Sequence, residues 1–322
     1  MSRVFVIGSR GSKLALWQAN WVRERIEAAS PGARVRVEVI KTEGDARRDV
    51  PLSVIGGRGV FTKEIEQALI ESRVDIAVHS LKDLPTVTPH GLHLAATPER
   101  EDARDALVLR EGFTPDERTT DGALTLLPRG ARVGTSSVRR LAQLKHRRPD
   151  LNILDLRGNV DTRLRKLDGG WYEAVVLASA GLRRLGLDAR ISAPLTTEEM
   201  LPAVGQGALG LETRRDDEET NALLRALDHA PTRAACTAER SLLRALGGGC
   251  QLPIAAHAVV VGDTLKLEAL VAAPEGEKII GDAIEGDTAE AEELGARLSE
   301  ILIGRGALTL LPSAAQNNRE SR

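Results

Sequence analysis

The stretch TKEIEQALIESRVDIAVHS, residues 62–80, indicates the fold class, because it joins a helical pattern to a buried strand. Apolar residues recur at helical spacing from Thr62 to Arg73, whereas DIAVHS is a short apolar run of the kind found in buried strands. Upstream, VFVIGS and the alternating valines of residues 35–39 favour strands, and the helix expected between them has Ser12 as its N-cap. Strand–helix–strand alternation predicts an α/β sheet with both faces covered.

Two further blocks follow. After PEREDARDALVLR, the segments RVGTS, LNILDL and AVVLAS favour strands separated by helices, the first of them over residues 138–147. The C-terminal part differs: a helix over residues 234–246 ends in three glycines and precedes IAAHAVVV, TLKLEALVA, KIIGDAIEG and a closing helix over residues 289–302. This order predicts a small α+β unit after the two α/β blocks, and the polar tail is expected to be disordered.

The composition excludes several classes of protein. Lys and Arg total 44 against 46 Asp and Glu, which excludes a polycation that coats nucleic acid, and aromatic residues, at 2%, are too few for a base-stacking surface. Two cysteines exclude a disulfide framework and favour a reducing compartment, and no apolar run is long enough for a membrane helix. Six histidines without HExxH give no metal-ligand spacing. We therefore expect a soluble cytoplasmic protein without a metal.

Four loops at expected strand ends combine arginine with small residues: GSRGS at 8–12, GGRG at 56–59, GTSSVRR at 134–140 and RGN at 157–159, with Arg163 following. Glycine lets backbone N–H groups approach an anion, and arginine offers a planar fork that matches a carboxylate. One such loop alone is better explained as a solvated turn. Four at comparable junctions favour a shared site for a polyanion.

Two further segments have both an ordinary and a functional interpretation. Asp83 in HSLKDLP is either a turn residue or a carboxylate that handles a proton or stabilises a developing cation. Cys250 in GGGCQLP is either a small buried hydrophobe or an attachment point, because three glycines leave room for a bulky group. Cys236 has only the ordinary interpretation. The match of GQGALG at 205–210 to a dinucleotide fingerprint is rejected, because the following ALGLET favours a strand and not a helix.

Together these segments resemble the porphobilinogen deaminase (hydroxymethylbilane synthase) family of tetrapyrrole biosynthesis. The matching stretches, in the order of the family, are GSRGSKLALWQA, GGRGVFTKE, DIAVHSLKDLP, EREDARDA, VGTSSVRR, LRGNVDTRL, LASAGLRRLG, LPAVGQGALG, TAERSLL and GGGCQLPIAA. The resemblance implies two periplasmic-binding-protein-like α/β lobes and a smaller C-terminal α+β domain with a three-stranded antiparallel sheet. The implied domains are 1–99 with 205–228, then 104–200, then 229–312, followed by the tail 313–322.

The resemblance also implies the chemistry. Members of the family join four porphobilinogen molecules head to tail, release ammonia at each addition, and free linear hydroxymethylbilane with water. The chain grows on a dipyrromethane cofactor, which a thioether would attach to Cys250. The family usually works as a cytoplasmic monomer, and uroporphyrinogen-III synthase is a candidate for transient handover of the product. No nucleic acid or membrane partner is expected.

By match to the family motifs, Asp83 is the catalytic aspartate. The cofactor-binding residues implied besides Cys250 are Ser80, Lys82, Thr135, Ser136, Arg139, Arg140, Arg157, Arg163 and Arg184. The substrate-binding residues implied are Arg10, Ser12, Arg58 and Gln206, and many members have lysine at the position of Arg58. Several charge-assisted hydrogen bonds, each worth about 1.5–3 kcal/mol, would offset the repulsion among the carboxylates of a growing pyrrole chain.

Two rival interpretations stay open from the residues alone. A non-catalytic two-lobed anion-binding module would suit the arginine loops, but it leaves GGGC and HSLKD without a purpose. A cysteine-dependent transferase with Cys250 as a turnover nucleophile would need a positioned base, and no histidine has an evident claim to that role. A pyrrole colour with Ehrlich's reagent on the denatured protein would separate the deaminase from both rivals.

Overall fold

The computed structural model of the protein describes residues 3–42, 62–113, 122–249 and 251–312. The chain divides into two compact units. Unit 1 comprises residues 1–101 and 207–233, and unit 2 comprises residues 102–206 and 234–322. The three domains expected from the sequence stay a prediction, because this division separates two units and not three.

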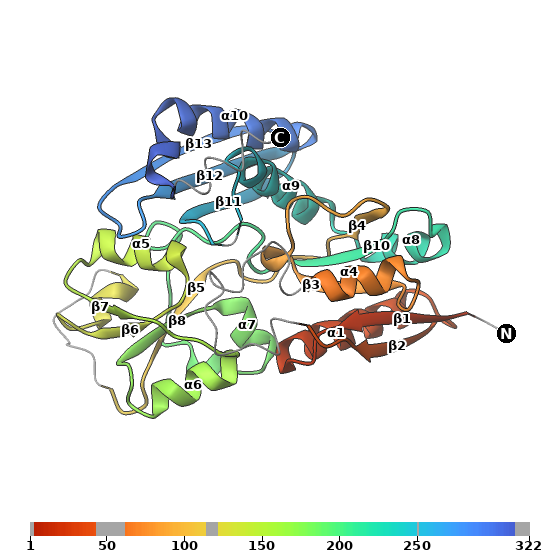
Figure 1. Ribbon diagram of the computed structural model, residues 1–322, viewed down its shortest axis with the longest axis horizontal. Helices are drawn as coiled ribbons and strands as arrows, with labels where there is room; N and C mark the ends of the chain where they lie inside the picture. Colours follow the sequence, from red (N-terminus) through yellow and green to blue (C-terminus); the bar gives the residue numbers. More distant parts are fainter. Residues whose placement is uncertain (1–2, 43–61, 114–121, 250, 313–322) are drawn as a thin grey trace. The chain divides into compact units, whose positions relative to one another are not determined.

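Unit 1 is built on one five-stranded sheet (Figure 1). Its strands are β1 (Val4–Ser9), β2 (Arg34–Val39), β3 (Ile76–Ser80), β4 (Leu92–Ala96) and β10 (Leu209–Arg214). Their order is β2-β1-β3-β10-β4, with β1, β2 and β3 parallel and β10 antiparallel to both of its neighbours. The parallel strands therefore end at one edge of the sheet, and β10 begins there.

Helices cover both faces of this sheet, as the alternation of strands and helices predicts. They are α1 (Lys13–Ala29), α4 (Lys63–Ile70) and α8 (Glu218–Leu224). The core on the α1 face includes Ile26 and Val78, and the core on the α4 face includes Ile65 and Ala77. Val78 and Ala77 are neighbours on β3, so the period-two alternation of a strand supplies one residue to each core.

The ends of the helices show where local sequence decides the structure. The Ser12 hydroxyl accepts a hydrogen bond from Ala15 N at 3.2 Å, so the expected N-cap of α1 is confirmed. Helix α4 ends at Ile70 and not at Arg73 as expected. The reason is that Ser72 adopts a left-handed φ of 57° and Arg73 N turns back to donate to Ala68 O, which closes the helix.

The first part of unit 2 repeats the plan of unit 1. Its strands are β5 (Asp105–Leu109), β6 (Arg132–Gly134), β7 (Asn152–Leu154), β8 (Ala174–Ala178) and β9 (Ala193–Pro194). The order is β7-β6-β8-β5-β9, with β6 parallel to β7 and β8, and β5 antiparallel to β8 and β9. Its helices are α5 (Val138–Arg147), α6 (Val160–Asp168) and α7 (Ser179–Arg184). The expected pair of α/β lobes is confirmed.

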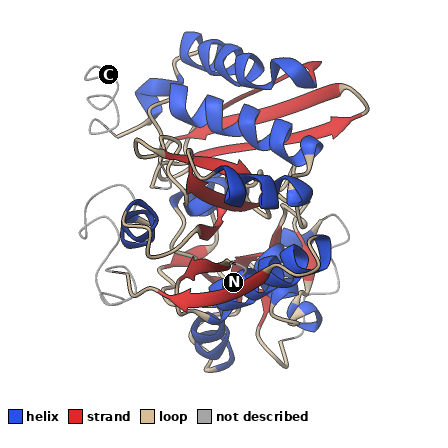
Figure 2. Ribbon diagram, turned by 90° about the vertical axis from the view of Figure 1, so that its right-hand side faces the viewer, coloured by secondary structure: helices blue, strands red, loops and turns tan. Residues whose placement is uncertain are grey.

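The C-terminal part of unit 2 is an antiparallel sheet with two helices (Figure 2). Its strands are β11 (Ile254–Val261), β12 (Thr264–Ala272) and β13 (Ile279–Asp287), and its helices are α9 (Ala230–Ala245) and α10 (Ala291–Gly304). All three strands and both helices contribute to one hydrophobic core, among them Leu242, Leu267 and Leu298. This arrangement confirms the expected α+β part with three antiparallel strands. No helix in the described ranges is long and apolar enough to span a membrane.

Candidate active site

The carboxyl edge of the unit 1 sheet carries most of the site residues predicted for this unit. Arg10 and Ser12 follow β1, and Ser80, Lys82 and Asp83 lie at or just beyond the end of β3. Since β1 and β3 are neighbouring parallel strands, their carboxyl ends meet at the same edge. Ligands of open α/β sheets bind at this edge. The structure therefore brings these five residues to one edge of a single sheet.

A short anchored turn presents Asp83. Leu81–Asp83 forms one turn of 3₁₀-helix, in which Leu81 is 1% exposed and Leu84 is also buried. Leu81 N donates to Ala208 O at 3.0 Å, and Leu84 N donates to Leu81 O at 3.1 Å. Asp83 itself is exposed. Two buried leucines and two backbone hydrogen bonds thus hold a solvent-facing carboxylate in a defined place.

Ser80 is oriented by a residue that the sequence did not single out. Gln18, buried on α1, donates from Nε2 to Ser80 Oγ at 2.9 Å, and Ser80 Oγ lies 3.3 Å from Gln18 Oε1. The same helix begins at the Ser12 cap. Helix α1 therefore connects the loop after β1 to the end of β3 through buried polar contacts.

The opposite face of β3 holds a buried group of titratable residues. His79 Nε2 lies 3.3 Å from Glu212 Oε2, and Glu66 of α4 interacts with both side chains. Burial, and then the charge of Glu212, raise the pKa of Glu66. Glu212 is fully buried, and its Oε1 has no hydrogen-bond partner among the described residues. The described residues contain no group of three or more His, Cys, Asp or Glu side chains that could hold a metal ion.

In unit 2, the corresponding edge is formed by the ends of β6, β7 and β8. Thr135 and Ser136 follow β6, and Ser137 caps α5, its hydroxyl accepting from Arg140 N at 3.5 Å. Thr135 is buried, and its hydroxyl oxygen accepts a hydrogen bond from Ser137 N at 3.2 Å. The polar residues of GTSS are thus used partly to build the junction between strand and helix.

Three predicted arginines lie in the segments after β7 and β8. Arg157 Nε donates to Asp155 at 3.1 Å, Arg163 Nε donates to Gly158 O at 2.7 Å, and Arg184 is buried in α7. Gly158 has a φ of +114°, and a Cβ there would lie 2.7 Å from Thr162. The glycine of the RGN loop is therefore required by the backbone.

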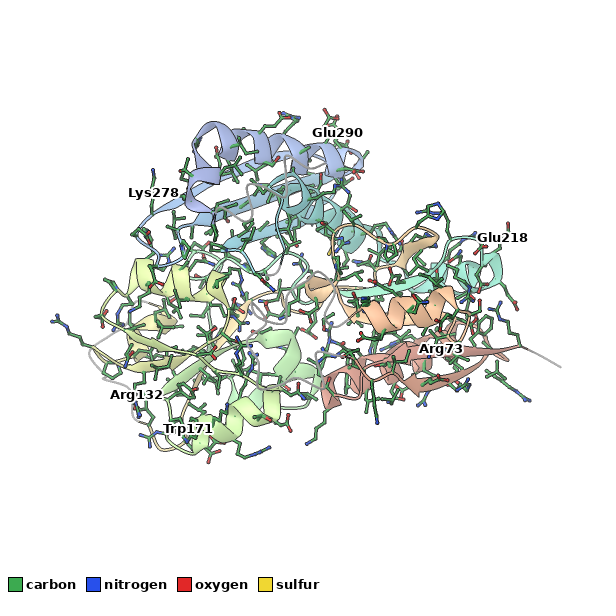
Figure 3. The ribbon with its side chains drawn as sticks, viewed as in Figure 1. Arg73, Arg132, Trp171, Glu218, Lys278 and Glu290 are labelled. Carbon is green, nitrogen blue, oxygen red and sulfur yellow. The ribbon has the colours of Figure 1, made fainter. Side chains whose placement is uncertain are left out.

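The amino-terminal edge of this sheet carries different contacts. Arg132 begins β6 and forms a salt bridge with Glu173, while Trp171 precedes β8 (Figure 3). The Arg132 guanidinium also donates to Gly170 O at 3.1 Å. These contacts tie neighbouring strand ends together. The predicted ligand-binding residues of unit 2 lie at the other edge of the sheet.

Arg139 and Arg140 both form salt bridges with one buried aspartate. Asp105, the first residue of β5, accepts from Arg139 Nη1 at 2.8 Å and from Arg140 Nη2 at 2.7 Å. All three side chains are buried. Gln206, predicted to bind substrate, is also buried and donates from Nε2 to Asp105 Oδ1 at 2.9 Å. These side chains therefore form an internal network in unit 2.

The remaining predicted residues fall elsewhere. Cys250 and Arg58 lie outside the described residues, as does the expected tail of residues 313–322. Cys236 is buried in α9, as its ordinary interpretation predicts. The rejected GQGALG match leads into strand β10, so the structure agrees with the rejection.

Two profiles of one known family match the chain. A family profile described as "Porphobilinogen deaminase, dipyromethane cofactor binding domain" matches residues 5–222, and one described as "Porphobilinogen deaminase, C-terminal domain" matches residues 233–304. The chain belongs to the porphobilinogen deaminase family. As a member of this family it is a transferase of tetrapyrrole biosynthesis with a dipyrromethane cofactor, so the predicted family, enzyme class and cofactor are confirmed.

Relatives match along nearly the whole chain. The porphobilinogen deaminase of Syntrophotalea carbinolica is 51% identical over 305 residues, which cover 95% of this chain and 94% of that protein. The porphobilinogen deaminase of Trichlorobacter lovleyi is 49% identical over 310 residues, 96% of each chain.

Solved structures with lower similarity include an arginine-specific periplasmic binding protein of Salmonella typhimurium, with 13% identity and a TM-score of 0.39. The match covers 70% of this chain and 92% of that one. A substrate-binding domain of an amino acid transporter from Streptococcus pneumoniae has 12% identity and a TM-score of 0.44, with 70% and 92% covered. Such low values carry no information about binding or activity.

The dipyrromethane cofactor of this family carries several carboxylates. The hydrogen-bond donors at the unit 2 edge can therefore be compared with what such a group needs. Arg157, Arg163 and Arg184 supply guanidinium groups there, and Arg139 Nε is a buried donor without a partner among the described residues. Two arginines share one aspartate in the buried network. The donor set therefore fits a group that carries carboxylates.

Sequence reasoning missed Gln18, Asp105, Glu66 and Glu212. Asp105 lies within the EREDARDA stretch that supports the resemblance, but nothing in its local pattern distinguishes it from a solvated acid. The sequence held one weak signal for Gln18. It lies four residues before Val22, so on α1 it shares the face of this buried residue. Neither residue could be paired with its partner before the strands were placed.

Proposed function

We propose that Asp83 is the catalytic carboxylate of this enzyme and that Cys250 is the point where its dipyrromethane cofactor is attached through a thioether. The observation that carries the proposal is the exposed Asp83 on its anchored turn at the carboxyl edge, with Ser80 and Lys82 beside it in sequence. Loss of ammonia from the aminomethyl group of porphobilinogen leaves an electron-poor methylene. Positive charge then develops on a pyrrole nitrogen, which a nearby carboxylate stabilises.

Each residue has a defined part in this proposal. Asp83 accepts the pyrrole N–H, stabilises the developing cation and assists proton transfer. Arg10 and Ser12 bind the acetate and propionate groups of porphobilinogen, and Lys82 binds those of the cofactor, with Gln18 fixing the orientation of Ser80. The cofactor supplies a tethered pyrrole as the nucleophile on which the chain is extended.

In unit 2, Thr135, Ser136, Arg157, Arg163 and Arg184 are proposed to hold the carboxylates of the cofactor. Arginine suits this role, because its guanidinium stays charged at every working pH and matches a carboxylate with two parallel hydrogen bonds. Arg139, Arg140 and Gln206 are proposed to have a different role, because all three donate to the buried Asp105. They would support this edge from the interior of unit 2. Arg58 is proposed to bind substrate on the strength of its motif alone.

Three finer properties are proposed from the family resemblance. The enzyme works as a monomer, it is cytoplasmic, and it hands hydroxymethylbilane to uroporphyrinogen-III synthase by a transient contact. All three are supported only by membership of the porphobilinogen deaminase family.

Intact mass tests the proposal. The full chain, expressed with porphobilinogen available, should exceed its polypeptide mass by two porphobilinogen units less two molecules of ammonia, and Cys250→Ala should carry no added mass. Cys236→Ala is the matched control and should keep the full increment, because Cys236 is buried in α9. A wild-type mass equal to the bare polypeptide would refute the attachment, and an unchanged increment in Cys250→Ala would move it to another residue.

A further inference from the structure

A single buried carboxylate organises the polar interior of the unit 2 edge. Asp105 is fully buried at the start of β5, where its Cα lies opposite Ala178, the last residue of β8. Its Oδ1 accepts from Arg140 Nε at 3.1 Å and Nη2 at 2.7 Å, and its Oδ2 accepts from Arg139 Nη1 at 2.8 Å. Because β5 runs antiparallel to β8, this places the carboxylate at the carboxyl edge of the parallel strands.

Each guanidinium is held at a second point. Arg139 Nη1 also donates to Leu201 O at 2.7 Å, and Arg140 Nη1 donates to Val176 O at 2.8 Å. A guanidinium is planar and rigid, so contacts on two sides fix its orientation as well as its position. Neither arginine can swing toward a ligand without breaking contacts to buried partners, and breaking such contacts is costly.

The network also holds the segment that leads out of unit 2. Gln206 Nε2 donates to Asp105 Oδ1 at 2.9 Å and to Ala103 O at 2.7 Å. One carboxylate thus receives donors from α5 and from residue 206, which are far apart in sequence. Removing it would take one hydrogen-bond partner from all three side chains at once.

The charges within this network are unequal. Two guanidinium groups face one carboxylate, which leaves one positive charge in a buried place, and Arg139 Nε is buried without a partner among the described residues. Burial raises the pKa of Asp105, but the two arginines outweigh it and hold that pKa well below its ordinary value. The carboxylate is therefore ionised throughout the working range. Burial, and then Arg140, lower the pKa of Arg139, but a guanidinium keeps its proton at any working pH, so the excess positive charge stays in place.

We propose that Asp105 is a positioning residue of this enzyme: it holds Arg139, Arg140 and Gln206 so that a fixed excess of positive charge lies behind the carboxylate-binding edge of unit 2. This inference rests on the proposed function, because it assumes that the edge binds the carboxylates of a pyrrole chain. A preorganised positive field attracts such carboxylates without any reorganisation when they bind. Without Asp105 the two guanidinium groups repel each other and lose their common orientation.

Two variants of Asp105 separate positioning from a purely structural ion pair. Asp105→Glu keeps the charge but shifts the carboxylate by one methylene, whereas Asp105→Asn keeps the shape and removes the charge. If Asp105 positions the arginines, both variants should slow the gain of pyrrole mass on the apo chain by about 10-fold or more, the size of one lost charge-assisted hydrogen bond. The kcat of the fraction that does carry pyrrole should stay within about twofold, because Asp83 and its turn are not altered.

Asp150→Asn is the matched control. Asp150 also pairs with an arginine, Arg148, in the same unit, but it lies just before β7 at the amino-terminal edge. This variant should lower the melting temperature slightly and leave KM and pyrrole loading unchanged. If Asp105→Asn does not fold, Asp105→Glu decides, since it retains the charge that the buried arginines require.

The outcomes separate this inference from the proposed function. A wild-type rate of pyrrole loading in the folded Asp105 variants would overturn the positioning role, even if their melting temperatures fall. A lower kcat of the loaded fraction together with a wild-type rate of loading would also overturn it, because the role is in binding the cofactor. If the wild-type chain itself carries no pyrrole and consumes no porphobilinogen, the proposed function fails first, whatever the variants do.

Discussion

The side-chain amide of Gln18 lies 2.9 Å from the hydroxyl oxygen of Ser80, and this contact joins the buried side of α1 to the last residue of β3. Ser80 is three residues before Asp83, and the turn between them is anchored by Leu81. The amide acts as both donor and acceptor toward the hydroxyl. A helix that begins at the Ser12 cap therefore also determines the geometry at the start of the Asp83 turn.

Replacing Gln18 with alanine tests this relationship. We expect Gln18→Ala to lower the free energy of unfolding by about 1–3 kcal/mol, because a buried hydrogen bond is lost and a cavity remains. The KM for porphobilinogen should rise by a similar factor in Gln18→Ala, Ser80→Ala and the double variant, since the two residues act as one unit. Denaturant unfolding and steady-state kinetics measure both effects.

Asn20→Ala is the control for Gln18, because Asn20 lies on the same helix and its side chain, within the part of the chain that the structure describes, donates only to Leu16 O of that helix. It should leave KM unchanged. Additive effects of the Gln18 and Ser80 changes on KM would show that the contact does not couple them.

Asp83→Asn should remove most of the turnover without unfolding the protein. The side chain is exposed, so the melting temperature should stay within a few degrees of wild type. Loss of the carboxylate should lower kcat by about 10²–10⁴-fold, the range for a positioned acid or base. Asp216→Asn, an exposed aspartate after β10, is the control and should keep full activity. A kcat for Asp83→Asn within twofold of wild type would exclude the catalytic role.

The group of Glu66, His79 and Glu212 predicts a pH dependence of stability. Burial and the charge of Glu212 raise the pKa of Glu66 in the folded state. A raised folded pKa means that stability is complete below the unfolded pKa of about 4.3 and is lost as the pH rises through the folded pKa. Glu66→Gln should therefore stabilise the protein at pH 8 and have little benefit at pH 4.

Denaturant unfolding at several pH values measures this difference, with about 1.4 kcal/mol corresponding to one pKa unit. Glu71→Gln, at the C-cap of the same helix, is the control. Its contacts with Gln67 and Arg73 lower the pKa of Glu71, so this variant should give no gain at high pH. A Glu66→Gln variant that is less stable than wild type at pH 8 would show that the Glu66 charge supports the fold.

Gly276 tests the contact between the β12–β13 hairpin and α5 within unit 2. His146 Nδ1 lies 2.9 Å from Gly276 O, and a Cβ at this glycine would lie 2.3 Å from Ala142 O. Since Ala142 O and the next atom that the Cβ would meet, His146 N at 2.8 Å, both belong to the backbone, little can shift. We expect Gly276→Ala to cost more than about 2 kcal/mol of unfolding free energy, from a left-handed φ of +78° and the clash together.

Gly262→Ala is a matched control, because Gly262 also has a positive φ, +60°, but nothing within 4 Å of the added Cβ. It should cost about 1 kcal/mol, the price of the backbone conformation alone. Equal losses in the two variants would mean that the hairpin yields readily and that its contact with α5 adds nothing to stability.

Much of the fold could be predicted from local patterns. Ser12 was expected to cap α1 and does so, and the helix expected over residues 138–147 matches α5 (Val138–Arg147). The predicted end of α4 at Arg73 was wrong, because the left-handed Ser72 closes the helix early and apolar spacing does not report such a conformation. The site could be predicted at the level of motifs, since HSLKD and GTSSVRR lie at the strand ends where ligands bind.

The sequence by itself determined the α/β lobes, the antiparallel C-terminal sheet and the family, because these depend on contacts within a few residues and on motifs in a constant order. Only the tertiary structure decided that Arg139 and Arg140 donate hydrogen bonds to Asp105, which is 34 and 35 residues away from them in the sequence. The same holds for the hydrogen bond between Gln18 and Ser80, which are 62 residues apart. Such pairings depend on which strands become neighbours and in which register. A slip of one residue in β3 or β5 would turn Ser80 or Asp105 to the other face of its sheet and away from these partners, so no local pattern encodes the pairings.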